Sequence, residues 1–122
     1  MNVFERLDCV CLHTDNLEVS LSFLKSMSLV EAWRLDREDA SGQWTIVGLD
    51  FPDRTSSQLV LSTHPDRRFI EIEIRVKNVR EAYKHLTQLA GVRWIAEPFP
   101  IEVGHVTVMT SPDGNNFVLI GD

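Results

Sequence analysis

Two carboxylates, Glu71 and Glu73, occupy alternate positions in the stretch Glu-Ile-Glu-Ile-Arg. Alternation in a strand places both side chains on one face of a sheet. If that face lines a cavity, the pair can contact a basic ligand or act as a general base. The other interpretation, which stays open, is that Arg75 neutralises both carboxylates in a structural ion pair.

Cys9, Cys11 and His13 alternate in the same way near the N-terminus and share one strand face. The two cysteines are too close along the chain to form a disulfide framework. No Cys-His-acid signature supports a nucleophile, so Cys9 is expected to be a small buried side chain. A replacement metal site would need His13 and Glu73 to converge, alone or with His105, and no spacing here matches a known ligand signature.

Three tryptophans, Trp33, Trp44 and Trp94, lie in or beside predicted strands. Each taken singly is expected to fill the core, with Trp44 or Trp33 the best candidate to contact a planar ligand. The sequence contains no glycine-rich phosphate loop, no serine-centred elbow and no paired-cysteine zinc pattern. Nucleotide and hydrolase chemistry are therefore not predicted.

The elements that must position these residues come from an internal repeat. The segment 9–24 matches 71–86 at an offset of 62 residues, and 42–47 matches 104–109 at the same offset. Asn16 meets Asn78 in this alignment, and each is a good helix N-cap. A ferredoxin-like repeat is the main alternative, but each copy contains four predicted strands.

Hydrophobic periodicity predicts one order in both copies: strand, helix, strand, strand, strand. Gly91 is predicted to cap the second helix. The predicted strands are 7–14, 29–36, 43–50, 57–63, 68–76, 92–97, 103–110 and 115–121, and the predicted helices are 17–27 and 79–90.

Two motifs resemble the vicinal oxygen chelate superfamily of glyoxalases, bleomycin-resistance proteins and extradiol dioxygenases. One is Asn-Leu-Glu-x-Ser-Leu-x-Phe ending at Phe23, and the other is the Pro-Asp-Gly-Asn turn ending at Asn115. The resemblance covers essentially the whole chain. It implies an α+β fold in which two tandem βαβββ modules form a curved mixed sheet around a cleft, with the helices on the outside. We expect a single domain, 1–122, with module one at about 1–64 and module two at about 65–122.

Metal-dependent members of that superfamily hold a divalent ion with four residues, two from each module. The resemblance places those positions on Cys9, Val60, Glu71 and Val118. Valine has no donor atom, and one Cys with one Glu is a poor set for Mn, Fe, Ni or Mg. The resemblance therefore implies that the metal site is lost, and no metal or other cofactor is predicted; a divalent metal held by an atypical ligand set is the alternative.

The nearest functional analogy is the bleomycin-resistance branch, whose members bind a drug without chemistry. We therefore expect a protein that binds a small cationic or aromatic molecule in a metal-free cleft, with drug sequestration as one form of this function. The alternatives are a metal-dependent lyase, isomerase or dioxygenase, and a metal-free enzyme with Glu71 or Glu73 as base. No residue is assigned a catalytic role. The predicted ligand contacts are Cys9, His13, Trp44, Gln58, Val60, Glu71, Glu73, Asn116 and Val118.

Bulk properties limit the partners. A net charge of -6 over 122 residues gives no clustered basic surface for nucleic acid, and it modestly favours a cationic ligand. No apolar run approaches the length of about 20 residues that a membrane span needs. A cytoplasmic protein without a membrane partner is expected, and the resemblance implies a homodimer.

Overall fold

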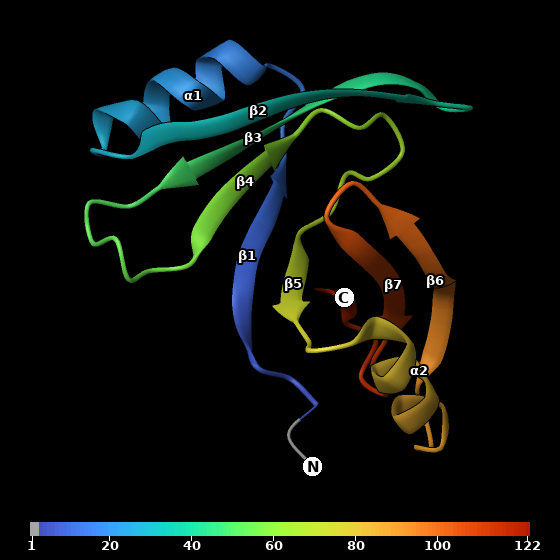
Figure 1. The fold of residues 1–122 in the computed structure, drawn as a ribbon. Coiled ribbons are helices and arrows are strands. Elements are labelled where there is room, and N and C mark those ends of the chain that lie inside the picture. The colour runs from blue at the N-terminus through green and yellow to red at the C-terminus, as the bar shows by residue number, and fades with distance from the viewer. Residues whose placement is uncertain (1–2) are drawn as a thin grey trace. The chain divides into compact units, whose positions relative to one another are not determined.

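A computed structural model describes residues 3–122. Ten elements follow one another in the predicted order, so that β1-α1-β2-β3-β4 is repeated as β5-α2-β6-β7-β8 (Figure 1). The α+β class and the two tandem βαβββ modules are therefore confirmed. The strands are β1 (Arg6–His13), β2 (Val30–Asp39), β3 (Gly42–Asp50), β4 (Gln58–Ser62), β5 (Glu71–Arg75), β6 (Arg93–Ile101), β7 (Gly104–Thr110) and β8 (Asn116–Gly121), and the helices are α1 (Leu17–Ser26) and α2 (Val79–Thr87).

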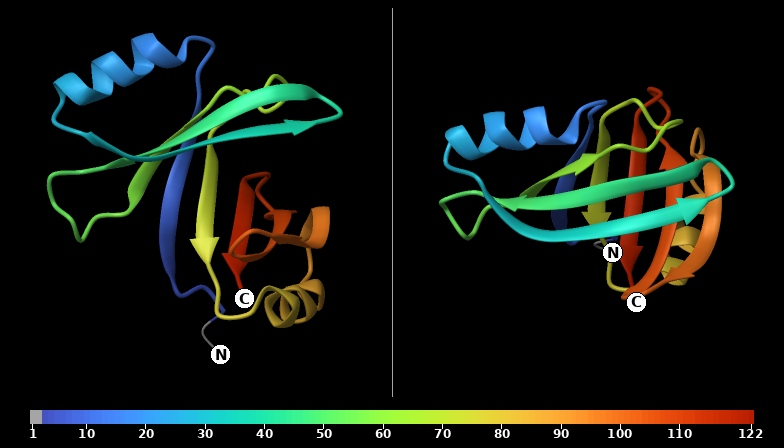
Figure 2. Two further views of the ribbon diagram at one scale, coloured as in Figure 1. Left: turned by 45° about the horizontal axis from the view of Figure 1, so that its top comes forward. Right: turned by 90° about the horizontal axis from the view of Figure 1, so that it is seen from above.

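The chain divides into two compact units, and we call residues 9–70 the first unit. Its sheet has the order β2-β3-β4-β1, with β1 parallel to β4 and the other neighbours antiparallel. Helix α1 lies along one face of this sheet (Figure 2). The core between helix and sheet consists of the buried residues Leu21, Leu29, Val47, Leu49 and Leu61.

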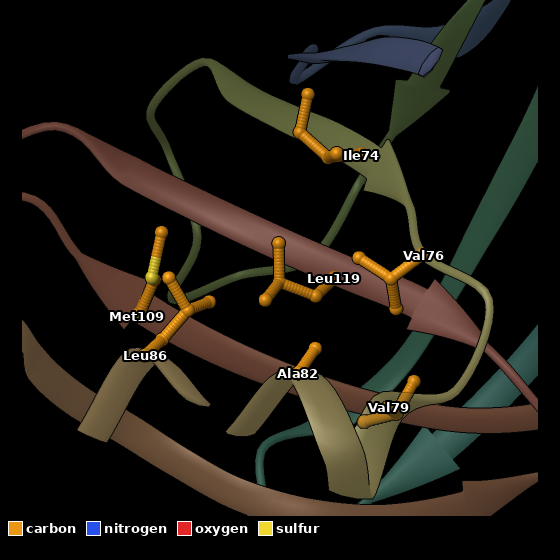
Figure 3. Close-up of a cluster of buried hydrophobic side chains, with 7 residues drawn as sticks. All are labelled: Ile74, Val76, Val79, Ala82, Leu86, Met109 and Leu119. Carbon is orange, nitrogen blue, oxygen red and sulfur yellow. The ribbon is translucent and has the colours of Figure 1, made fainter. Parts of the chain in front are cut away.

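The second unit comprises residues 71–122 together with the N-terminal residues up to Asp8. Its sheet has the order β5-β8-β7-β6, with β5 parallel to β8. Val79, Ala82 and Leu86 of α2 point at the sheet, where they meet Met109 and Leu119 (Figure 3). Each unit thus has one sheet face covered by a helix and one face without a helix.

Both helices begin at the predicted asparagines. The Asn16 side chain accepts a hydrogen bond from the Val19 N-H at 3.2 Å, and the Asn78 side chain accepts one from the Glu81 N-H at 3.0 Å. These bonds satisfy backbone donors that a helix start otherwise leaves unpaired. The repeat predicted from the sequence therefore includes the same cap in both copies.

Four predicted boundaries were wrong by three residues or more. Strand β2 extends to Asp39 instead of residue 36, and β5 begins at Glu71 instead of residue 68. The other two are the ends of α2 and β6. Helix α2 ends at Thr87 instead of residue 90, because the next amides bond three residues back, from Gln88 to His85 and from Leu89 to Leu86. Gly91 does adopt a left-handed conformation with φ of 86°, but it lies beyond the helix end. Strand β6 continues to Ile101 instead of residue 97, through two prolines. Prolines are tolerated there because β6 is the last strand of its sheet order.

None of the described helices is long and apolar enough to cross a membrane.

Candidate functional site

In the first unit, the predicted contacts lie on the sheet face away from α1. Neighbours in the β1–β4 ladder include Cys9 with Gln58 and Cys11 with Val60. The alternate residues of these strands, such as Leu12 and Leu61, pack in the α1 core. Because side chains alternate across a strand, the predicted contacts must point to the helix-free face. Cys9 and Val60 are buried there, whereas Gln58 is half-buried.

Trp33 is the main aromatic side chain on this face. It pairs with Gly48 across the β2–β3 ladder, and its indole ring occupies the space directly above that glycine. A Cβ atom at position 48 would overlap the ring, so only glycine leaves room for the indole in this position. Trp33 is 36% exposed, which leaves part of the ring open to solvent.

Gln58 fixes the orientation of this indole. Its Oε1 accepts a hydrogen bond from Trp33 Nε1 at 3.0 Å, and its Nε2 donates one to Asp50 Oδ1 at 2.8 Å. The other Asp50 oxygen forms an ion pair of 3.2 Å with Arg54, whose side chain is 78% exposed. We call Trp33, Gly48, Gln58 and Asp50 the tryptophan platform: an oriented aromatic ring with a carboxylate one side chain away.

Trp44 does not lie in the platform. Its ring packs against His64 with centroids 4.4 Å apart, near one end of the β2–β3 hairpin. His64 lies in the loop after β4 and is only 4% exposed. Its Nδ1 accepts from the Asp66 N-H at 3.1 Å, and its Nε2 lies 3.7 Å from Asp39. A hollow of about 590 Å³ lies beside Trp44 and is lined by Asp36, Arg37, Glu38, Gln43, Trp44, Thr45 and Thr63.

His13 ends strand β1 opposite Ser62. Its side chain is only 10% exposed, and its Nε2 lies 3.9 Å from Asp15. Asp15 in turn pairs with Arg68 at 2.7 Å. The imidazole is thus at the edge of the helix-free face, next to a carboxylate that already has a cationic partner.

In the second unit, the remaining predicted contacts also lie on the helix-free face. Glu73 is next to Val118 in the β5–β8 ladder, and Ile72 and Ile74 on either side of Glu73 pack toward α2. Glu71 is 9% exposed, and Asn116 accepts a hydrogen bond from Thr110 at 3.0 Å. Further along, this face is apolar, with Val106, Val108 and Ile120 buried and Val118 packed against them. Carboxylates therefore stand at one edge of an apolar surface.

Arg75 belongs to the same face and forms an ion pair with Asp8. Its Nε lies 3.6 Å from Asp8 Oδ1, and Asp8 also pairs with Arg6 at 3.5 Å. Carboxylate oxygens of Asp8 and Glu73 lie within 4.8 Å of each other. Asp8 is therefore a further carboxylate beside Arg75 and Glu73, which the repeat alone did not indicate.

The superfamily's four metal positions do not fit a divalent ion in this chain. Val60 and Val118 lie on the helix-free faces where donor atoms would be needed, beside Cys11 and Glu73 in their ladders. An aliphatic side chain cannot coordinate Mn, Fe, Ni or Mg. No chemical step through a metal is derived from this donor set.

His105 does not join Glu73 in the second unit. It is opposite Gly121 in the β7–β8 ladder, and it has the parity of Thr107 and Met109, whose partners include the core residue Leu119. Its side chain therefore points to the α2 face, whereas Glu73 points to the other. The replacement metal set considered from the sequence is not brought together by these two residues.

The platform shows what sequence reasoning missed. Trp33 was one of two tryptophans expected to contact a planar ligand, the other being Trp44. Neither Gly48 nor Asp50 was expected to contribute to the site. A register shift between Glu31 and Trp33 changes the side-chain alternation of β2, so parity along the strand does not predict where Trp33 points. A glycine inside an apolar strand pattern was the available signal, since it often marks a close approach.

Comparison of the sequence with family models finds no match, and comparison with curated proteins finds none either. Solved structures do match. Methylmalonyl-CoA epimerase superposes with a TM-score of 0.74 at 13% identity, covering 98% of this chain and 96% of that one. A glyoxalase/bleomycin resistance protein/dioxygenase superfamily member from Vibrio splendidus 12B01 has a TM-score of 0.65 at 16% identity, covering 93% and 97%.

The 2,3-dioxygenase LapB from Pseudomonas sp. KL28 also has a TM-score of 0.65, at 17% identity, and the match covers 96% of this chain but 42% of that one. At such identities the likeness concerns the fold and not the reaction. These matches cover nearly the whole of this chain and therefore both of its βαβββ modules. The chain therefore has the vicinal oxygen chelate fold.

Proposed function

We propose that this protein binds a small planar organic molecule, preferably a cation, on the helix-free face of its first unit and without a metal. Sequestration of such a molecule, as in drug resistance, is the form of function that the proposal favours. The observation that supports it is the tryptophan platform, in which the Trp33 indole packs on Gly48 and donates its N-H to Gln58.

The platform suits this ligand class for two physical reasons. An aromatic ring stacks on planar groups and attracts cations to its face, with a contribution of about 0.5–2 kcal/mol for the cation. Asp50 adds a carboxylate that Gln58 holds next to the ring. Because Trp33 and Gln58 restrain each other, little side-chain entropy is lost when a ligand stacks.

Arg54 predicts how charge affects binding. Arg54 already forms an ion pair with Asp50, and because this pair is exposed it contributes little to stability. A cationic ligand on Trp33 has to compete with it. Removal of Arg54 is therefore expected to strengthen the binding of cations and to leave neutral ligands unaffected.

A matched series of probes tests the proposal by calorimetry: N-methylquinolinium is planar and charged, quinoline is planar and neutral, and tetramethylammonium is charged without a ring. We expect the affinity order to follow that sequence, with N-methylquinolinium weakened roughly 3- to 30-fold by Trp33→Ala. Trp94→Phe, in the second unit, is the control and should have no effect. Equal binding by wild type and Trp33→Ala would reject the platform as the site.

A metal-dependent lyase, isomerase or dioxygenase remains the alternative function. The epimerase and the dioxygenase among the structural matches share the fold, but they support no reaction here at 13% and 17% identity. The two valines at the superfamily's metal positions argue against this alternative. A homodimer in the cytoplasm is likewise part of the proposal.

A further inference from the structure

The helix-free face of the first unit carries a second tryptophan on the same strand as Gly48. Strands β2 and β3 form one long hairpin (Figure 2), and Trp44 and Gly48 are both even-numbered residues of β3. The odd-numbered Val47 and Leu49 pack in the α1 core, so the even-numbered residues point to the other face. Trp44 and the Trp33 ring above Gly48 therefore share one face of the hairpin.

The spacing of the two tryptophans sets a length. Gly48, above which the Trp33 ring lies, is four residues from Trp44 along β3, which corresponds to about 13 Å. Between them, Leu35 and Ile46 are opposite each other in the β2–β3 ladder and lie on the same face. Leu35 is 43% exposed and Ile46 is half-buried, so apolar surface connects the two rings. We call Trp33, Leu35, Ile46 and Trp44 the aromatic strip.

The Trp44 ring is held in place, as the Trp33 ring is. Its centroid lies 4.4 Å from that of the His64 ring. The buried His64 is itself fixed, because its Nδ1 accepts a hydrogen bond from the Asp66 N-H. Trp44 is half-buried, so part of the residue stays open to solvent. A restrained and partly exposed ring loses little side-chain entropy when a planar group stacks on it.

The repeat shows that the fold does not require these rings. At the offset of 62 residues, Trp44 corresponds to Val106 and Trp33 corresponds to Ile95. Val106 is buried in a small aliphatic cluster of the second unit. An aliphatic side chain thus satisfies the same position of a βαβββ module. Two partly exposed tryptophans on one face are therefore a property of the first unit, and this indicates a binding role.

The two ends of the aromatic strip differ in charge. At Trp33, Gln58 holds the carboxylate of Asp50 next to the ring. At Trp44, the ladder partner on the same face is Arg37. A cation is attracted to the first end, whereas the guanidinium repels it at the second. The end at Trp44 is therefore unfavourable for a second cation.

An anion is not favoured at the Trp44 end either. Arg37 lies between Asp36 and Glu38 in the chain, and Asp39 lies 3.7 Å from His64 Nε2. These three carboxylates oppose the attraction that a single guanidinium exerts on an anion. A planar group without charge is the ligand group that fits this end.

We propose that the ligand of this face is an elongated molecule with two planar groups joined by an apolar chain. The cationic group stacks on Trp33, the uncharged group stacks on Trp44, and the chain lies on Leu35 and Ile46. This inference rests on the proposed function, because it extends the same site. Joining two groups makes the second contact intramolecular, which raises the affinity. A span of about 13 Å corresponds to a chain of roughly ten methylenes.

A series of quinolinium salts tests this proposal by calorimetry with the wild-type protein, below the concentrations at which long-chain salts form micelles. N-methylquinolinium and N-decylquinolinium are the references. In the test ligand, a chain of about ten methylenes joins quinolinium to a naphthyl group, and it should bind roughly tenfold more tightly than N-decylquinolinium. An analogue with a chain of about two methylenes cannot span the strip and should lack this gain. Equal affinities of the test ligand and N-decylquinolinium would overturn the proposal.

Two variants locate the contacts. Trp44→Leu should lower the affinity of the test ligand to that of N-decylquinolinium and leave N-methylquinolinium unchanged. Leu35→Gln, a change at an exposed position, should weaken N-decylquinolinium but not N-methylquinolinium. Trp94→Phe, in the second unit, is the control and should change none of these affinities. Unchanged binding of the test ligand by Trp44→Leu would overturn the proposal, and if this variant unfolds, the wild-type series decides alone.

The charge of the second group has its own test. A bis-quinolinium salt with the long chain differs from the test ligand in the charge at the Trp44 end. It should bind more weakly than the test ligand, because Arg37 repels the second cation. Tighter binding of the bis-quinolinium salt would overturn the assignment of an uncharged group to Trp44.

N-methylquinolinium separates this inference from the proposed function. If it binds in a way that depends on Trp33 but the naphthyl group adds nothing, the proposed function stands and the inference fails. If none of the quinolinium salts binds, or if Trp33→Ala leaves their binding unchanged, both fail.

Discussion

Replacing Gly48 with alanine should dismantle the tryptophan platform. The added Cβ would overlap the Trp33 ring, and because Gly48 does not adopt a left-handed φ, the backbone itself accepts alanine. The indole must move away from position 48 and lose its hydrogen bond to Gln58. The cost therefore arises in the side chain at position 33 and not in the main chain at position 48.

The expected magnitude follows from these two losses. The hydrogen bond accounts for about 1 kcal/mol, and exposure of roughly 60 Å² of ring surface for about 1.5 kcal/mol. Alanine regains about 0.5–1 kcal/mol by restricting the unfolded chain. The free energy of unfolding should fall by about 1.5–2 kcal/mol, which corresponds to a loss of roughly 5–10 °C in Tm for a chain of this size.

A double-mutant cycle shows whether the account is right. Measured by urea unfolding, Gly48→Ala should cost about 1.5–2 kcal/mol in the wild-type background. In a Trp33→Ala background, where no ring remains to be displaced, only the effect on the unfolded chain is left, and the substitution should stabilise the protein by about 0.5–1 kcal/mol. If Gly48→Ala lowered the free energy of unfolding equally in both backgrounds, the two substitutions would be additive. That result would refute the reasoning that glycine is needed at position 48 to make room for Trp33.

Three further predictions concern a helix cap, the ion pair of Glu31 with Arg34, and the second unit. Asn78→Ala should lower the free energy of unfolding by about 1 kcal/mol, because the Glu81 amide loses its acceptor, and urea unfolding measures this. The hydrogen bond from Arg34 lowers the pKa of Glu31 below its ordinary 4.5. The charged carboxylate therefore contributes its full stabilisation of the fold above that value, and this is lost as pH falls through the folded pKa. Glu31→Gln should thus lower Tm at pH 7 but not in strong acid, which Tm measured against pH will show. Glu71→Gln, in the second unit, should leave the affinity for N-methylquinolinium unchanged by calorimetry, because the proposed site lies on the first unit. A weakened affinity would contradict that placement of the site.

The fold was predictable because the sequence contains the pattern of one βαβββ module twice. Apolar alternation and the paired asparagines gave the order of elements, and parity correctly placed Gln58 and Glu73 on the helix-free faces. The end of α2 was predicted poorly, because periodicity continues to Leu89 although the hydrogen bonds tighten after Thr87. Local patterns record which face a residue belongs to and do not record where the last turn changes its bonding.

The candidate site was less predictable because it depends on register. Trp33 packs on Gly48 only because β2 pairs with β3 and the register between these strands shifts before Trp33. The hydrogen bond from Gln58 to Asp50 joins β3 and β4 across the loop between them. His64 is similar, since only the folded hairpin brings it against Trp44. These contacts link residues far apart in the chain, and no motif marks such pairs in a single sequence.

Metal content is the measurement that tests the central claim most directly. Elemental analysis of the purified protein, followed by thermal-shift titration with Mn, Fe, Ni, Zn and Mg, should give no stoichiometric metal and no saturable rise in Tm, while N-methylquinolinium does raise it. A stoichiometric metal, or a saturable shift with one of these ions, would contradict a metal-free binding protein and favour the metal-dependent enzyme.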